Sequence, residues 1–232
     1  MKKQTEFELR KISESVFDKS TLMTLYELAK DKKLDEMVGI VSSGKESNVY
    51  HGFLGKREIA IKIYAIEASE FKNMDYYIKG DRRFPAWRNR RQLVYLWAKK
   101  EFKNLMRVHE EVPCPEPIAV EKNVMVMSFI GEGGVAAPKL KDSPPENPEE
   151  FLNEIVGFLK AMYKRGFVHG DLSEYNILNA GKPVLIDFSQ GVLKDHPYAD
   201  ELLGRDVKNL CQYFSGLGIE ADEGEILGKI RK

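Results

Sequence analysis

Cysteine and net charge are both scarce in this sequence. Only Cys114 and Cys211 occur among its 232 residues, which is too few for a disulfide framework and favours a reducing compartment such as the cytoplasm. Basic and acidic side chains balance at 36 each, so the formal net charge is zero. The overall charge therefore gives no reason to expect nucleic-acid binding, although local patches can differ from the average.

Long apolar runs are also missing. No stretch approaches the roughly 18 apolar residues of a membrane-spanning helix, and the opening MKKQTEFELRKISES lacks the apolar core of a secretion signal. We therefore expect no membrane partner. The chain does have 43% hydrophobic residues, which is enough for one large domain or two packed lobes.

The first third of the chain predicts a helix followed by strands. Residues 20–31 have apolar side chains at helical spacing, with Ser20 as the expected cap. Beyond them, the segments 38–41, 49–53 and 59–63 are rich in β-branched residues and are separated by turn formers. The apolar positions of the helix are Leu22, Leu25, Tyr26 and Ala29.

The middle of the chain is mostly helical in pattern over residues 66–108. The basic segment 80–91 breaks this pattern around Pro85, and we interpret it as a flexible loop ahead of a helix over 92–108. A hairpin is then predicted that turns at residues 121–123.

The remainder begins with a Gly- and Pro-rich stretch over 131–148, the expected boundary between two lobes. A helix should follow it, because Asn147 can act as the cap and Pro148 suits the first helical position. A small hairpin turning at residues 179–182 and a helix over 199–215 complete the predicted elements.

Strands dominate the front of the chain and helices the back, so the predicted fold class is α+β with two lobes. The expected division is a helical extension over 1–36, an N-lobe over 37–130 and a C-lobe over 131–232. Two-lobed folds usually bind ligands in the cleft between the lobes.

The stretch VHGDLSEYNILNAGKPVLIDFSQ, residues 168–190, combines the polar residues that phosphoryl transfer needs. The spacing D-x-x-x-x-N suits a loop in which Asp171 orients a hydroxyl and Asn176 offers an amide oxygen to Mg²⁺, a cation that prefers oxygen ligands. Asp187 ends the following apolar strand and offers a second metal ligand. Asp and Asn are common turn residues, so the prediction depends on the whole ordered set, which also includes His169.

A lysine upstream fits the same chemistry. Lys62 lies in the strand IAIKIY, and burying its charge on the inner face of a sheet is costly unless it meets an opposite charge. An ATP phosphate and a carboxylate on a helix would both supply this opposite charge. Glu101 is the expected carboxylate, with Glu110 and Glu111 as alternatives near the end of the same helix.

The segment SSGKESNVY stands between the first two strands, where a loop covering phosphates belongs. Its three G-x-G-x-x-G positions are Ser42, Gly44 and Ser47, so only one is glycine. Serine is small enough to let the backbone approach a phosphate, and its hydroxyl can donate to one. The alternative is an ordinary hairpin turn.

Taken together and in order, these motifs resemble the RIO family of atypical serine/threonine-protein kinases. The similarity is carried by SGKESNVYHG, IAIKIY, WAKKEFKNL, VMVMSFIG, VHGDLSEYNIL, VLIDFSQ and GRDVKNLCQYF, and it covers nearly the whole chain from about Leu22. The form GDLSEYNIL is similar to the first branch of that family, in which no winged-helix domain is expected, and points to an archaeal member.

The resemblance implies a role for each candidate residue. Asp171 would be the catalytic acid/base, Asn176 and Asp187 would bind Mg²⁺, or Mn²⁺ in its place, and Lys62 oriented by Glu101 would hold the ATP phosphates. Backbone atoms of Ser128 and Ile130 would bind adenine. Asp187 would also accept a phosphoryl group during ATP hydrolysis, which would make the protein an ATPase-like switch.

The sequence also departs from ordinary protein kinases. His-Gly-Asp replaces His-Arg-Asp at 169–171, Asp-Phe-Ser replaces Asp-Phe-Gly at 187–189, and no A-P-E motif occurs in the 45 residues after Asp187. We therefore expect a truncated C-lobe without an activation segment or a full peptide groove.

Three functions remain open at this point. The first is a RIO-type kinase that also phosphorylates itself, and the second is a small-molecule phosphotransferase like aminoglycoside and choline kinases, which share H-G-D-x-x-x-x-N. The third is an ATPase-driven assembly factor. The resemblance implies a pre-ribosomal small-subunit particle as partner, and the basic run with Trp87 could contact its RNA, although such a run is more often a solvated surface. The basic run comprises Arg82, Arg83, Arg88, Arg90 and Arg91.

Overall fold

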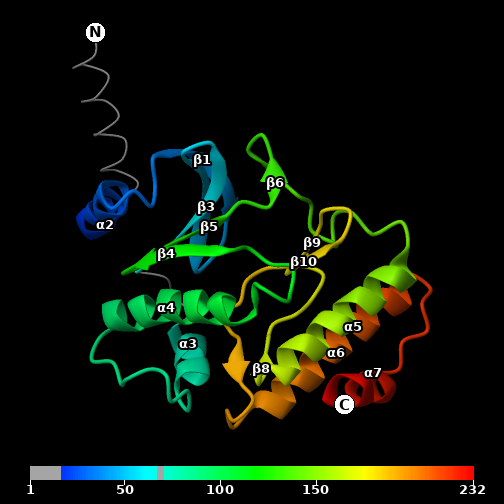
Figure 1. Cartoon of the computed structure of the whole chain (residues 1–232). Helices are drawn as coiled ribbons and strands as arrows, with labels where there is room; N and C mark the ends of the chain where they lie inside the picture. Colours follow the sequence, from blue (N-terminus) through cyan, green and yellow to red (C-terminus); the bar gives the residue numbers. More distant parts are fainter. Residues whose placement is uncertain (1–16, 67–70) are drawn as a thin grey trace.

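The computed structural model describes residues 17–66 and 71–232 of the chain. It has the expected two-lobed, mixed helix and sheet architecture (Figure 1). Residues 1–16 of the predicted N-terminal extension lie outside the described residues. Within the described residues, no helix has the length and apolar character needed to cross a membrane.

A five-stranded antiparallel sheet forms the N-lobe, with strand order β1-β2-β3-β5-β4. The predicted hairpins and turns are confirmed. The central strand β3 is buried along most of its length, whereas β1 lies at the edge and leaves Val38 and Ile40 largely exposed. The strands are β1 (Glu36–Ser43), β2 (Ser47–Leu54), β3 (Arg57–Tyr64), β4 (Pro117–Glu121) and β5 (Val124–Ser128).

Helix α2 (Lys19–Lys30) forms where the sequence predicts a helix, but its cap and its buried face differ from the prediction. Asp18, not Ser20, is the cap, because its carboxylate accepts hydrogen bonds from the first free N–H groups of the helix. The buried side chains are Thr21, Thr24 and Leu28, and Tyr26 is exposed. Threonine packs there because its hydroxyl can bond locally, which a count of apolar residues misses.

Helices α3 (Phe71–Ile78) and α4 (Arg90–Val108) connect β3 to β4 and lie beneath the sheet in Figure 1. Asn89 caps α4, so the helix begins two residues earlier than predicted. The basic segment between the two helices folds into turns, and its Arg83 is held by Asp81 in a short ion pair.

The Gly- and Pro-rich stretch contains a short hairpin, β6 (Gly131–Glu132) with β7 (Val135–Ala136), and a bridge from Lys139 to Leu178. Helix α5 (Pro148–Lys164) follows and begins as predicted, because the side chain of Asn147 accepts a hydrogen bond from the N–H of Glu150.

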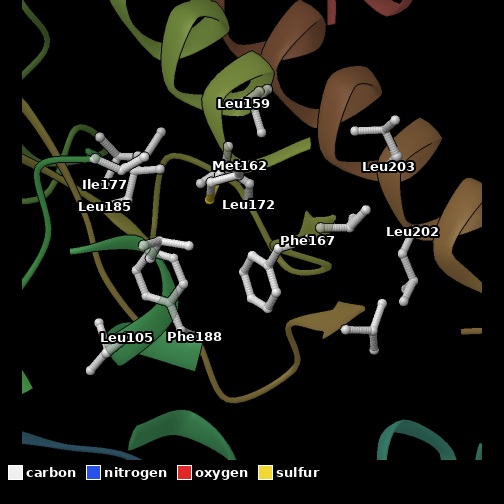
Figure 2. Close-up of a cluster of buried hydrophobic side chains, with 14 of the residues drawn as sticks. Leu105, Leu159, Met162, Phe167, Leu172, Ile177, Leu185, Phe188, Leu202 and Leu203 are labelled. Carbon is white, nitrogen blue, oxygen red and sulfur yellow. The ribbon is translucent and has the colours of Figure 1, made fainter. Parts of the chain in front are cut away.

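The C-lobe gathers α5 with helices α6 (Ala199–Gly216) and α7 (Glu223–Arg231) around short strands (Figure 1). The hairpin β9–β10 and helix α6 confirm the prediction, whereas α7 is an addition to it. Figure 2 shows a buried cluster that joins this lobe to α4, in which Phe188 lies near Phe167 and Leu105 of α4. The short strands are β8 (Phe167–Val168), β9 (Ile177–Asn179), β10 (Pro183–Leu185) and β11 (Val192–Leu193).

Candidate active site

A buried ion pair connects the sheet to helix α4. The ammonium of Lys62 on β3 donates to both carboxylate oxygens of Glu101, at 3.0 and 2.8 Å. The hydroxyl of Tyr64 donates to the same carboxylate. Lys62 is 5% exposed and Glu101 1% exposed. Glu101 is therefore the charge partner of the lysine, as the sequence predicts. The alternative Glu111 lies at the surface, where it pairs with Arg165.

The same lysine reaches the C-lobe. Its Nζ lies 3.2 Å from Oδ1 of Asp187, which also accepts a 2.7 Å hydrogen bond from the hydroxyl of Ser189. Asp187 has a φ of +59°, a left-handed conformation that is uncommon for residues other than glycine and is often found at functional sites. Burial opposes the charged form of Asp187, but the Lys62 ammonium and the Ser189 hydrogen bond lower its pKa to about 2.

Asp171 and Asn176 meet within one loop, as the spacing predicts. The amide nitrogen of Asn176 donates to the backbone oxygen of Asp171 at 2.8 Å and to its Oδ2 at 3.0 Å. Burial and the negative charge of Asp187 raise the pKa of Asp171 to about 6. A cavity of about 540 Å³ opens beside Asp171, with Tyr76, Tyr77 and Arg205 in its wall. A carboxylate with a raised pKa beside a cavity is a candidate acid/base group.

The backbone around Asp171 is held from helix α6. The carboxylate of Asp206, which is fully buried, accepts hydrogen bonds from the N–H groups of Gly170 at 2.7 Å and Leu172 at 2.8 Å. Arg205 donates to the carbonyl of Gly170 and to the hydroxyl of Tyr77. Gly170 has a φ of +78°, which explains why glycine stands before Asp171.

His169 is a structural residue in this arrangement. It is fully buried, its ring lies 4.7 Å from that of Phe188, and its Nε2 donates to the carbonyl of Ile186 at 3.2 Å. Burial lowers the pKa of His169 to about 4, so the ring is neutral near pH 7. Its hydrogen bond links the loop that contains Asp171 to the segment that precedes Asp187.

Oxygen donors at this position fit a magnesium ion. Because the amide nitrogen of Asn176 faces Asp171, its carbonyl oxygen would be the ligand atom, and the carboxylate of Asp187 would supply a second oxygen. Among the described residues no cluster of three or more His, Cys, Asp or Glu side chains forms a metal site. Two protein oxygens suit an ion such as Mg²⁺, which is usually bound by one or two protein ligands together with water and substrate phosphates.

The three predicted phosphate-loop residues lie at the turn between β1 and β2. The N–H of Gly44 donates to the carbonyl of Ser47 at 3.0 Å, and a Cβ at Gly44 would lie 3.1 Å from that oxygen. Ser42 pairs with Val49 and Ser47 with Tyr64 in the sheet. The turn is thus a tight hairpin, and binding of phosphate by these residues stays a prediction.

The predicted adenine-binding segment follows β5. The N–H of Ser128 donates to the carbonyl of Glu116 at 2.8 Å, and the carbonyl of Ile130 accepts from the N–H of Ala137 at 3.0 Å. These contacts restrict the expected adenine contacts to the carbonyl of Ser128 and the N–H of Ile130.

Sequence reasoning missed two groups of residues around the site. One is Asp206. In the sequence this acidic residue stands at helical spacing from the apolar Leu203 and Leu210, a pattern that indicates a buried carboxylate. The other is a pair on α4, Lys100 and Asn104, which are both fully buried and contact the turn after Asp187. Their spacing of four residues places them on one face of the helix.

Comparison with known proteins identifies the family. Residues 48–226 match the sequence profile of the RIO domain. The chain is 46% identical to the RIO-type serine/threonine-protein kinase Rio1 of Methanocaldococcus jannaschii over 88% of this chain and 71% of that protein. It is 40% identical to the human serine/threonine-protein kinase RIO1 over 87% of this chain and 37% of that protein.

A solved structure agrees with this result. The fold matches the Rio2 kinase-ADP/Mg²⁺-phosphoaspartate complex from Chaetomium thermophilum with a TM-score of 0.70 and 25% identity, covering 90% of this chain and 66% of that chain. The relatives named here are protein kinases, not small-molecule phosphotransferases. The chain therefore belongs to the RIO family of serine/threonine-protein kinases.

Proposed function

We propose that the chain binds ATP with Mg²⁺ and transfers the γ-phosphoryl group to serine or threonine hydroxyls, including its own. The observation that carries this proposal is that Lys62 contacts both Glu101 and Asp187, while Asp171 and Asn176 are joined in the neighbouring loop. A lysine between two carboxylates, next to a third carboxylate with a raised pKa, matches the demands of phosphoryl transfer.

Each residue has a role in the proposed reaction. Lys62, held by Glu101, neutralises phosphate oxygens, and Asp171 accepts the proton of the attacking hydroxyl. Asn176 and Asp187 hold the metal ion, which when bound neutralises charge on the phosphates. The carbonyl of Ser128 and the N–H of Ile130 bind adenine, and the turn with Ser42, Gly44 and Ser47 covers the phosphates.

A second activity, ATP hydrolysis through Asp187, is favoured by the similar Rio2 structure, which is an ADP/Mg²⁺-phosphoaspartate complex. In this step a carboxylate oxygen of Asp187 forms a bond to the γ-phosphorus, and the bond from that phosphorus to the β-phosphate oxygen breaks, releasing ADP. Water then hydrolyses the acyl phosphate. The carboxylate suits this step because its pKa of about 2 keeps it ionised.

The proposed partner is a precursor of the small ribosomal subunit, as the family resemblance implies. The proposed location is the cytoplasm, because the sequence has only two cysteines. Contact with its RNA would use the exposed arginines of the segment 80–91. Arg83 is not among them, because it pairs with Asp81 and contacts Asn104.

One experiment separates these activities. The chain is incubated with γ-labelled ATP and Mg²⁺, and free phosphate, labelled chain, labelled proteins of a small-subunit particle and a labelled aminoglycoside are measured in parallel. The proposal predicts Mg²⁺-dependent label in the chain and in serine or threonine of particle proteins, with none in the aminoglycoside. Label in the small molecule alone would contradict it, and free phosphate without protein label would favour the ATPase.

A further inference from the structure

Lys100 is a buried lysine that contacts backbone oxygens, and its burial together with the nearby Arg83 lowers its pKa to about 7. It lies one residue before Glu101 on α4 and is 0% exposed. Its Nζ donates to the carbonyl of Ser189 at 2.8 Å and to the carbonyl of Gly191. Among the described residues, no carboxylate forms an ion pair with it. Burying a lysine in this way is costly compared with an apolar side chain of similar size, so its contacts with the turn call for an explanation.

Asn104 lies one helical turn further along α4 and contacts the same segment. Its Nδ2 donates to the carbonyls of Phe188 at 2.7 Å and Gly191 at 3.0 Å. The orientation of this amide is fixed by Arg83, whose guanidinium can only donate and lies 2.9 Å from Oδ1 of Asn104. Arg83 in turn is held by the buried carboxylate of Asp81.

The carbonyls held by Lys100 and Asn104 belong to the residues that follow Asp187 directly. Asp187 has a left-handed backbone, and Phe188 is buried beside Phe167 (Figure 2). The direction of the Asp187 carboxylate therefore depends on where the backbone of residues 188–191 lies. Helix α4 also carries Glu101, which pairs with Lys62. The same helix therefore contacts both Lys62 and the turn after Asp187.

We infer that Lys100 and Asn104 are positioning residues that hold the 188–191 backbone so that the Asp187 carboxylate faces Lys62 and the metal ion. The metal part of this inference rests on the proposed function. The backbone part does not, because it concerns contacts within the chain. Neither residue touches the reacting atoms; both act through the peptide groups next to a metal ligand, as residues behind metal ligands often do.

The test uses two variants and one matched control. Lys100→Met removes the donor to two carbonyls and keeps a long side chain. Asn104→Asp keeps the side-chain volume and the oxygen that faces Arg83 but removes the donor to Phe188 and Gly191. This second variant still tests the inference if Lys100→Met fails to fold. Lys99→Met makes the same chemical change on the exposed side of the same helix.

The first measurement is amide hydrogen exchange of the peptide covering residues 187–193, followed by mass spectrometry. Loss of these hydrogen bonds is expected to speed exchange there by about tenfold, while exchange in β2 and β3 and in Lys99→Met stays at the wild-type rate. Unchanged exchange at 187–193 in the folded variants would overturn the inference, whether or not the chain turns over ATP.

The second measurement is the Mg²⁺ concentration that gives half-maximal ATP turnover. It is expected to rise roughly 10–100-fold in both variants, which is typical for loss of a partner behind a metal ligand, while nucleotide binding without Mg²⁺ changes less than about twofold. Equal losses of Mg²⁺-free nucleotide binding and of thermal stability would instead indicate a general packing role. A wild-type chain that neither binds nor hydrolyses ATP would refute the proposed function and leave the exchange result to decide the positioning role.

Discussion

The ammonium of Lys62 lies 3.2 Å from the carboxylate of Asp187. The two residues are 125 positions apart in the sequence and belong to different lobes, so this contact joins the sheet of the N-lobe to the segment that follows β10 in the C-lobe. The charges of Asp187 and Glu101 raise the pKa of Lys62 in spite of the opposing effect of its burial. The lysine is therefore charged at neutral pH.

Lys62→Ala is expected to remove most of the stabilisation that the chain gains from Mg²⁺ and ATP. Ligand at about 100 times its Kd stabilises a protein by about 2.7 kcal/mol, which corresponds to a rise in Tm of roughly 5–10 °C for a chain of this size. A thermal melt with and without Mg²⁺ and ATP measures this rise. Lys56→Ala, on the exposed turn between β2 and β3, should keep it. Equal rises in wild type and Lys62→Ala would contradict the role of this lysine.

Phosphorylated Asp187 is expected to accumulate during ATP hydrolysis. An acyl phosphate survives acid and is cleaved by hydroxylamine, so labelled protein is treated with each reagent before gel analysis. Asp187→Asn should carry no such label. If the wild-type chain turns over ATP while all of its label resists hydroxylamine, Asp187 is a metal ligand and not a phosphoryl acceptor.

Asp206→Ala is expected to destabilise the chain by about 2–5 kcal/mol, because two buried N–H groups, those of Gly170 and Leu172, lose their acceptor. Urea denaturation measures the free energy of unfolding. The matched control is Asp200→Ala in the same helix, where an exposed carboxylate pairs with Arg231 and its removal should cost less than about 1 kcal/mol. Similar losses in the two variants would show that Asp206 does not hold the Asp171 loop.

His169 should make the stability of the chain depend on pH. Burial lowers its pKa in the folded chain to about 4 from the ordinary 6.5, so between these values the unfolded chain binds more protons. The stability contributed by neutral His169 is thus present above about pH 6.5 and is lost as the pH falls toward 4, by an amount of up to about 3 kcal/mol. In His169→Gln this part of the pH dependence should vanish. Parallel plots of unfolding free energy against pH for the two proteins would refute this.

Much of the fold and the main site residues could be predicted because they depend on local patterns. The alternating strand around Lys62 and the spacing from Asp171 to Asn176 are set by neighbours in sequence. Helix α7 was missed although Asp222 caps it and Ile226 and Ile230 are buried at helical spacing, because two apolar positions give a weak periodic signal.

The supporting residues could not be predicted in the same way. Lys100 and Asn104 contact carbonyls more than 80 residues away in the sequence, and a backbone carbonyl has no sequence signature. In the sequence, nothing distinguishes the buried Lys100 from the exposed Lys99 next to it on α4. The face of α2 was misjudged for a related reason, since the buried Thr21 donates to Asp18 and accepts a hydrogen bond from the distant Asn123.

The most direct test of the account is single-turnover transfer from γ-labelled ATP with Mg²⁺ in wild type and Asp171→Asn, measured beside the ATP affinity of each. Asparagine keeps an oxygen for the amide of Asn176 but cannot accept the proton of an attacking hydroxyl. The account predicts a loss of transfer rate of about 10²–10⁴-fold with ATP affinity within about threefold of wild type. Transfer at the wild-type rate in folded, ATP-binding Asp171→Asn would contradict the central claim that Asp171 is the catalytic group of this site.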